Sequence, residues 1–480
     1  MKETNDTVVH NKGYNPERSS KSIRNPFAPQ ESMSDMQGNV ENKSSESSSG
    51  FSTLLSVSSF MFGCRIFGAG MVFLTQLLLA RWMGAYQLGV YVYAFSWCIV
   101  LSMVVGLGYE AATFRVIGQG LSNKRFDLIK GFILRGQQLM LIAGLVTVIV
   151  FGSIVIFSDG LFDPDYKNTL LIALITVPVY LIAVFHESVS HAFSWFAMMI
   201  MPSNVFRPTL LLLTVVIVWY ATGSLTSEQV MTYQLLAMAI IILIHYLIFK
   251  KRVKETVGDT EASFETRSWI RIGLPQLVPV LYIEFLAELN VILIGFFLPP
   301  DQVAIFSIAF RVAMLITFMI FAVDSFFRPK AALLYAEQDM HGLQKLTAHS
   351  TQLMFWPGLA CVIFFIIFGK FILGIFGEEF VAGYVVFALL ALSQLITVSI
   401  GPVSSLLNVT GHQDYSMMVF GSSLIILIIL NLILTPMMGM KGAAIAVVLV
   451  TAFWNIWLLI LVKKHLRIHP SVLSFAHKYE

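Results

Sequence analysis

Long apolar runs alternate with short polar segments along most of the chain. Each run is about 20 residues long, which is the length that a helix needs to cross ~30 Å of hydrocarbon. The runs occupy residues 51–79, 88–109, 136–157, 168–188, 205–222, 229–249, 271–297, 302–324, 350–369, 380–399, 415–435 and 441–462. The pattern therefore predicts an all-α polytopic membrane protein with twelve transmembrane helices.

Two longer polar segments divide the chain. Residues 1–50 contain no apolar run and end in the serine-rich sequence SSESSSG, which predicts a disordered cytoplasmic tail. The second polar segment, Lys250 to Arg271, separates the sixth run from the seventh. The predicted domains are thus a tail over 1–50, a six-helix lobe over 51–250, a linker over 251–270, a second six-helix lobe over 271–464 and a cytoplasmic tail over 465–480.

The two predicted lobes have the same orientation in the membrane, because each contains an even number of spans. A weak internal repeat agrees with this, since LGVYVYAFSW at 88–97 aligns with VAIFSIAFRV at 303–312. Parallel repeats are related by an axis along the membrane normal and hold their substrate between them. The sequence therefore predicts two parallel lobes around a central cavity.

Composition and charge agree with a membrane protein and predict its orientation. The chain is 57% hydrophobic and 12% charged, whereas about 25% of the residues of a soluble domain are charged. Lys and Arg gather in the polar segments that share a side with the tail, which predicts that both termini are cytoplasmic. The net charge of +3 follows from this asymmetry and indicates no nucleic-acid partner. Cys64, Cys98 and Cys361 all lie in apolar runs and lack the spacing of a metal site or disulfide framework.

The sequence contains no motif for catalysis or nucleotide binding. It lacks a glycine-rich phosphate loop, a zinc-type His-Glu pair at helical spacing and a Gly-x-Ser-x-Gly elbow. We therefore expect a protein that is not an enzyme and has no cofactor. Energy for transport would come from an ion gradient, the substrate gradient or a partner.

Five ionisable side chains lie at predicted membrane depth: Arg65, Glu284, Glu288, Arg311 and Asp324. Such charges are costly and usually face a bundle interior or a wet cavity. Arg65 and Arg311 are candidates for binding an anionic substrate, and the three acids are candidates for ion coupling. Alternatively, Glu288 and Arg311 pair between the seventh and eighth helices, and Arg65 forms an interhelical salt bridge.

Other charged or titratable residues lie near the predicted cytoplasmic ends of helices. Arg115 and Lys330 either anchor the topology or attract an anionic headgroup to the cytoplasmic mouth. For His186, Glu187 and His245, packing is the main interpretation and proton transfer the alternative. No group has the spacing of a metal site.

Several motifs resemble one known family. In LLARWMGAYQLGVYVYAFSW, Arg81, Gly84 and Gly89 stand where polysaccharide-transporter flippases carry a signature between their first two helices. Further matches follow in the same order: VGLGYEAATFRVIG at 105–118, IFGEEFVAGYVVFALLALSQLI at 375–396, LLNVTGHQDYS at 406–416 and NLILTPMMGMKGAAIAVVLV at 431–450. His412 departs from the pattern, because the family often has a basic residue there. The chain thus resembles O-antigen flippases of the multidrug/oligosaccharidyl-lipid/polysaccharide exporter superfamily.

The resemblance implies a V-shaped, two-lobed bundle with a cationic central cavity, and Arg65 matches a basic position often seen in the first helix. It also implies a flippase in the bacterial plasma (inner) membrane that moves undecaprenyl-pyrophosphate-linked oligosaccharides to the outer leaflet. Its product would feed lipopolysaccharide or exopolysaccharide synthesis. Its partners would be this substrate, membrane lipids, and a polysaccharide polymerase with chain-length proteins.

Two rival functions are considered. A cation-coupled multidrug exporter of the same superfamily would use Glu284, Glu288 and Asp324, but the sequence lacks the drug-exporter motifs expected in the first and seventh helices. A membrane-embedded polysaccharide polymerase or ligase typically has a large periplasmic loop, whereas the predicted outer loops are short. Both are therefore less favoured than the flippase.

Overall fold

The computed structural model describes residues 33–106, 108–157, 164–274, 277–470 and 472, and every regular element in them is a helix. Side chains are described from Ser59 onward, apart from those of residues 111, 164, 165, 277–285 and 319. Residues 1–32 of the predicted tail lie outside the described residues, and the first helix begins at Met33. The all-α prediction is confirmed for the described part of the chain.

The helices follow one another with short connections. Those of the first half are α1 (Met33–Val105), α2 (Tyr109–Ser122), α3 (Phe126–Phe157), α4 (Pro164–Ala192), α5 (Phe196–Met201), the π-helix η1 (Pro202–Phe206), α6 (Arg207–Thr222), α7 (Ser227–Val257) and α8 (Thr266–Gly273). Those of the second half are α9 (Leu277–Phe297), α10 (Pro300–Ala313), the 3-10 helix η3 (Met314–Ile316), α11 (Thr317–Ala336), α12 (Met340–Phe376), the 3-10 helix η4 (Glu378–Gly383), α13 (Tyr384–Ile400), α14 (Val403–Val409), α15 (Gln413–Met438) and α16 (Met440–Leu466).

Many of these helices could cross a membrane. Nine of the helices in the described residues are long and apolar enough, and α10 with α11, bent by 43° at their junction, would make a tenth. The first of the nine, Ser59–Val105, covers two predicted spans because it contains a non-helical break at Gly84. The chain is therefore a multi-pass membrane protein, while the count of twelve spans in two six-helix lobes remains a prediction.

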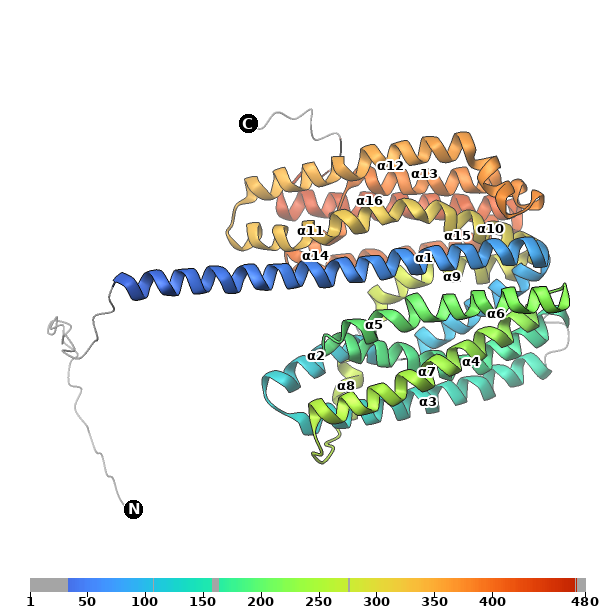
Figure 1. Cartoon of the computed structure of the whole chain (residues 1–480). Coiled ribbons are helices and arrows are strands. Elements are labelled where there is room, and N and C mark those ends of the chain that lie inside the picture. Colours follow the sequence, from blue (N-terminus) through green and yellow to red (C-terminus); the bar gives the residue numbers. More distant parts are fainter. Residues whose placement is uncertain (1–32, 107, 158–163, 275–276, 471, 473–480) are drawn as a thin grey trace, which may run out of the picture. The chain divides into compact units, whose positions relative to one another are not determined.

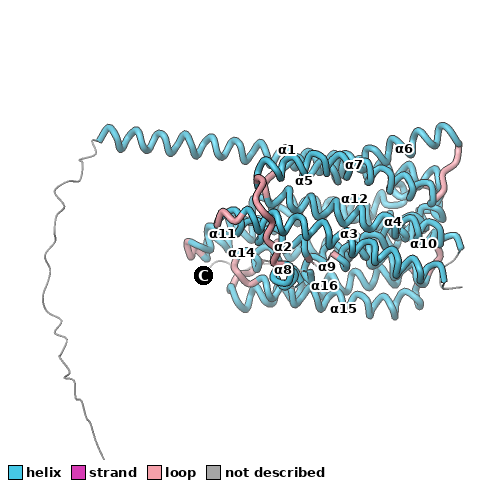
Figure 2. The backbone as a smooth tube through the Cα atoms, turned by 90° about the horizontal axis from the view of Figure 1, so that it is seen from below, coloured by secondary structure: helices cyan, strands magenta, loops and turns pink. Residues whose placement is uncertain are grey.

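The helices pack mainly with others of the same half of the chain. Residues up to Ser59 form one compact unit and residues from Phe60 a second, and the packing described here is that of the second. The extensive contacts among α2 to α8 include α3 with α4 and α4 with α7, and those among α9 to α16 include α9 with α15 and α15 with α16. Within the second unit, the long helices lie roughly along one common axis, with the chain passing up and down between its two ends (Figure 1, Figure 2).

The break at Gly84 divides α1 into a first limb, residues 60–83, and a second limb, residues 85–105. Gly84 has φ 76°, a left-handed conformation that glycine adopts without the steric cost borne by other residues. The chain reverses there, as the returning limb in Figure 1 shows. The signature position Gly84 is thus explained by backbone geometry.

The turn between the two limbs is attached to the second half of the chain. Arg81 Nε donates a hydrogen bond to the carbonyl oxygen of Ile375 over 2.6 Å. The backbone N–H of Ala85 donates to Glu379 Oε1, also over 2.6 Å. Arg81 is a signature residue, so its position is explained by a bond from α1 to the end of α12.

A close approach of two backbones lies just beyond the turn. Gly89 is buried, and a Cβ atom built on it would lie 1.8 Å from the carbonyl oxygen of Pro300, at the start of α10. Nearby, a Cβ on Gly295 of α9 would lie 2.3 Å from the ring of Tyr93. Only glycine therefore fits at the third signature position without moving α1 away from α10.

Candidate functional site

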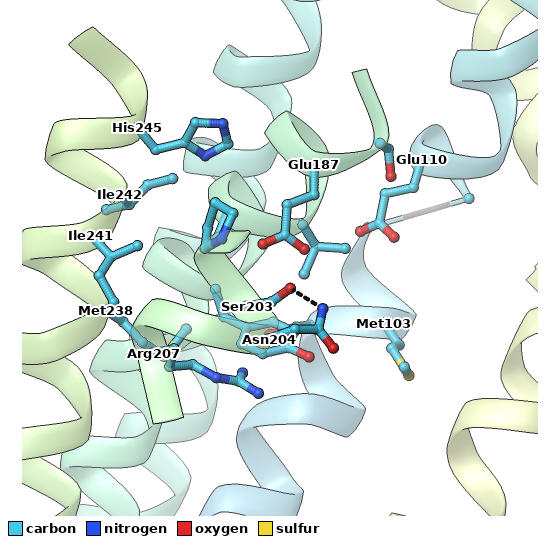
Figure 3. Close-up of a pocket in the computed structure, with 18 of the residues that line it drawn as sticks. Met103, Glu110, Glu187, Ser203, Asn204, Arg207, Met238, Ile241, Ile242 and His245 are labelled. Carbon is cyan, nitrogen blue, oxygen red and sulfur yellow. Dashed lines mark hydrogen bonds between the residues drawn. The ribbon is translucent and has the colours of Figure 1, made fainter. Parts of the chain in front are cut away.

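A cavity of about 560 Å³ lies among the second limb of α1, α2, α4, η1, α6 and α7. Its wall contains apolar side chains such as Met238, Ile241 and Ile242 from α7, together with Tyr180 from α4. Figure 3 shows these apolar side chains of α7 on one side and the acidic side chains on the other. The cavity is built entirely from the first half of the chain.

Three charged side chains face this cavity from different helices: Glu110 of α2, Glu187 of α4 and Arg207 of α6 (Figure 3). The carboxyl group of Glu187 interacts electrostatically with both Arg207 and Glu110 and lies near the hydroxyl of Ser203. One cation thus faces two carboxylates. Such a set can both accept hydrogen bonds from a ligand and donate them to it.

Two uncharged polar side chains of the wall come from η1. Pro202 opens this π-helix, and Ser203 and Asn204 follow it, with Asn204 Nδ2 donating to Ser203 Oγ over 3.0 Å. A single π-helical turn inside a longer helix is frequently found at functional sites. Here it joins α5 to α6 and places polar side chains beside Glu187 (Figure 3).

The two buried histidines have different surroundings. His186 stacks on Phe249 with ring centroids 4.3 Å apart, and its Nε2 lies 2.9 Å from Gln137 Nε2. His186 lines a second, more open groove that also contains Tyr246. His245 lines the main cavity, and its buried Nε2 has no hydrogen-bond partner among the described residues. One buried nitrogen of each ring, Nδ1 of His186 and Nε2 of His245, thus has no hydrogen-bond partner in the part of the chain that the structure describes.

The first limb of α1 passes beside the cavity. A Cβ on Gly68 would lie 2.1 Å from the carbonyl oxygen of Asn204, so α1 and η1 are in backbone contact. Arg65 is exposed and lies three residues earlier, which is the same side of a helix. Its charge acts on His191, whose ring meets that of Phe114 edge-on at 4.7 Å, and Phe114 lines the cavity. Arg65 therefore lies near the edge of the cavity, outside the residues that line it.

The ion pair considered between Glu288 and Arg311 is not among the ion pairs of the described residues. Glu288 Oε2 instead accepts a hydrogen bond from the hydroxyl of Ser96, on the second limb of α1. Gln76 lies on the first limb of α1. With its side-chain oxygen oriented toward Arg311, this oxygen accepts hydrogen bonds from Arg311 Nη1 over 3.0 Å and from Arg311 Nε over 3.2 Å. The predicted pairing of Glu288 with Arg311 is therefore wrong, because each side chain instead forms hydrogen bonds with a different polar side chain of α1.

Asp324 is held by its own neighbours on α11 and α14. Its Oδ2 lies 2.9 Å from Arg328 Nη2 and accepts a hydrogen bond from Ser405 Oγ over 2.8 Å. Its Oδ1 is buried with no hydrogen-bond partner in the described part of the chain. An ion-coupling role for Asp324 remains a prediction, as does that of Glu284, whose side chain lies outside the described residues.

The predicted substrate-binding residues do not form one cluster inside the cavity. Arg65 lies near its edge, Arg311 faces α1, and Arg115 and Lys330 are exposed on α2 and α11. Sequence reasoning missed Ser203, Asn204 and Arg207, and it weighed Glu187 only as a packing or proton-transfer residue. A usable signal was MPSNVFRP at 201–208, in which polar residues stand between two prolines directly before an apolar run.

A metal site is not indicated. Among the residues that the structure describes, no three His, Cys, Asp or Glu side chains are placed to hold a metal ion. The geometry instead suits an organic ligand, because the volume falls within the range of about 300–1,000 Å³ that is usual for small-molecule sites.

Comparisons with known proteins agree with one another. Residues 55–325 match the sequence model of the family described as polysaccharide biosynthesis protein. A relative from Haloferax volcanii, described as a probable low-salt glycan biosynthesis flippase, is 26% identical over 403 residues, which cover 81% of this chain and 79% of the relative.

Two solved structures share the fold. The lipid II flippase MurJ in an inward closed conformation has a TM-score of 0.68 at 15% identity, covering 85% of this chain and 87% of that one. A multidrug resistance MATE family transporter of the MOP superfamily, in an inward-facing conformation, has a TM-score of 0.65 at 17% identity, covering 83% of this chain and 98% of that one. The chain therefore has the fold of these transporters.

Proposed function

Because the chain belongs to the polysaccharide biosynthesis protein family, we propose that it is a flippase for lipid-linked oligosaccharides. More specifically, it moves undecaprenyl-pyrophosphate-linked units from the inner to the outer leaflet of a bacterial plasma membrane, for surface polysaccharide synthesis. The similarity to a relative described as a flippase supports the proposal. The observation that carries it is the exposed Arg65 beside a polar cavity, within a run of residues, 51–79, that has no other charged side chain.

The physical task of such a flippase is to shield a charged headgroup while the lipid tail stays in the bilayer. Moving a bare anion into hydrocarbon costs tens of kcal/mol by continuum estimates, so a cation must accompany it. In the proposal, Arg115 and Lys330 attract the headgroup at the cytoplasmic side, and Arg65 and Arg311 meet it inside. Glu284, Glu288 and Asp324 are the proposed ion-coupling residues, and a polymerase with chain-length proteins receives the product.

A flipping assay tests the function. The purified protein is reconstituted into liposomes with lipid-linked oligosaccharide extracted from cells that lack it, where unexported lipid accumulates. A membrane-impermeant glycosidase added outside cleaves only the oligosaccharide that has reached the outer leaflet. We expect oligosaccharide from the inner leaflet to be cleaved faster in liposomes with the protein than in protein-free liposomes. Folded protein that leaves this rate unchanged but transports ethidium down a cation gradient would instead support the drug exporter.

The proposed orientation, with both termini in the cytoplasm, rests on the distribution of Lys and Arg. Reporter fusions after Lys251 and at Glu480 should therefore be active with a cytoplasmic reporter and inactive with a periplasmic one. A periplasmic signal at either site would contradict the topology and the proposed direction of transport.

A further inference from the structure

We propose that the cavity beside η1 binds the oligosaccharide of the substrate, while Arg65 near its edge meets the pyrophosphate. This inference rests on the proposed function. The distribution of charge carries the first step. Glu110 and Glu187 face the cavity and would repel a phosphate group, whereas Arg65 lies outside, near its edge. The charged pyrophosphate and the uncharged oligosaccharide of one headgroup would thus bind at different places, the first at Arg65 and the second in the cavity.

The polar side chains of the cavity match the hydroxyl groups of a sugar. Carboxylates accept hydrogen bonds from hydroxyls, and the guanidinium of Arg207 and the amide of Asn204 donate them. Hydrogen bonds to charged partners are stronger than those between neutral groups. A neutral polyhydroxylated ligand uses both kinds of partner at once, which neither a simple anion nor a simple cation does.

The apolar wall and the size of the cavity favour the same class of ligand. Met238, Ile241 and Ile242 offer an apolar surface on which the C–H face of a pyranose ring can pack, and Tyr180 adds an aromatic ring. A bare cation would need far less than the available 560 Å³. The described residues also place no three metal-binding side chains together.

His245 adds an imidazole ring to the wall of the cavity. Its side chain lines the cavity and is 5% exposed, and its buried Nε2 has no hydrogen-bond partner among the described residues. Buried polar atoms are normally satisfied, because an unmatched one is destabilising. Nε2 of His245 is covered by protein atoms, and Nδ1 of His186, which lines the other groove, is unpartnered in the same way, so the inference rests on the remaining residues of the cavity wall.

Equilibrium binding to the full-length protein in lipid nanodiscs tests this division. The two probes are radiolabelled undecaprenyl pyrophosphate and the undecaprenyl-pyrophosphate-linked oligosaccharide extracted from cells lacking the protein. Glu187→Leu removes hydrogen-bond acceptors at similar size. Ala183 of α4 also lines the cavity, so Ala183→Phe fills it while keeping every polar group. The matched control is Glu228→Leu, which changes an exposed carboxylate of α7 that accepts a hydrogen bond from Asn168 outside the cavity.

We expect wild type and the control to bind the oligosaccharide-bearing lipid about 10- to 100-fold more tightly than the bare lipid, the effect of one or two hydrogen bonds to charged groups. Glu187→Leu and Ala183→Phe should each abolish this ratio and leave affinity for undecaprenyl pyrophosphate unchanged. Because both probes are titrated against one preparation, partial misfolding lowers the number of binding sites for both alike and does not change the ratio of the two affinities.

Two outcomes would overturn the inference. In the first, the two cavity variants keep the wild-type ratio of affinities, whether or not both affinities fall. In the second, ethidium displaces the oligosaccharide-bearing lipid from wild type and no longer binds to Glu187→Leu. Wild type that flips the substrate but binds both probes equally contradicts only the sugar site. Wild type that binds neither probe contradicts the proposed function itself.

Discussion

Arg65→Ala is expected to reduce surface polysaccharide to the level of the deletion strain while the amount of protein in the membrane stays normal. The guanidinium is exposed near the edge of the cavity, where it can grip a pyrophosphate through two parallel hydrogen bonds. Each such bond contributes about 1.5–3 kcal/mol, so losing two would slow transport at least ~100-fold. Removing a charge from an apolar helix also makes membrane insertion easier.

The lysine variant and a control complete this experiment. Arg65→Lys keeps the charge but loses the planar fork, so it should retain partial export. Arg267→Ala, which removes an exposed arginine of α8 far from the cavity in sequence, should restore export fully. Surface polysaccharide and membrane protein level are measured side by side in the deletion strain.

A structural role for Arg65 leads to a different result. An arginine that serves an interhelical ion pair leaves a carboxylate unpaired when it is removed. Arg65→Ala would then lower protein abundance and thermal stability together with export. Full export by Arg65→Ala at normal abundance would contradict both roles.

The helical fold could be predicted from the sequence because hydropathy is a local property. A segment crosses the bilayer when about 20 successive residues are apolar, whatever surrounds them. Gly84 shows where local reasoning stops. The positive φ of this residue reverses the chain within a single residue, so two predicted spans follow each other without a loop, and composition alone does not show how tight that turn is.

The candidate site could be predicted only in part. Arg65 could be identified because a positively charged residue within an apolar run is apparent from the sequence alone. The partners of Glu288 and Arg311 could not, since equal depth on neighbouring helices does not fix how each helix is rotated. In the structure both residues turn toward α1 and meet Ser96 and Gln76.

The cavity itself was beyond sequence reasoning. Its charged residues come from three helices, and in the sequence Arg207 stands out only as a basic residue near the start of an apolar run. A cavity arises where side chains fail to fill the space between helices, which depends on the packing of distant segments. The π-helical turn at Pro202 was equally hidden, although two prolines around polar residues marked the place.

Gly89→Ala is expected to destabilise the folded protein strongly. The added Cβ would lie 1.8 Å from the carbonyl oxygen of Pro300, and this obstacle is backbone rather than the end of a flexible side chain. α1 and α10 would have to separate, and they meet just beyond the turn that Arg81 and Ala85 attach to the second half of the chain. Overpacking of this kind costs about 1–3 kcal/mol or more, and helix propensity recovers only part of it.

The matched control lies on the same helix. Gly70 is exposed, and a Cβ built on it meets nothing within 4 Å, so Gly70→Ala should leave stability unchanged or raise it slightly through helix propensity. Melting temperature in detergent and the yield of monodisperse protein are measured for both variants. Equal melting temperatures for Gly89→Ala and wild type would mean that α1 and α10 are not held in close contact, and the explanation of the signature glycine would fail. A loss confined to Gly89→Ala would show that this family position is fixed by the contact of two backbones rather than by the substrate.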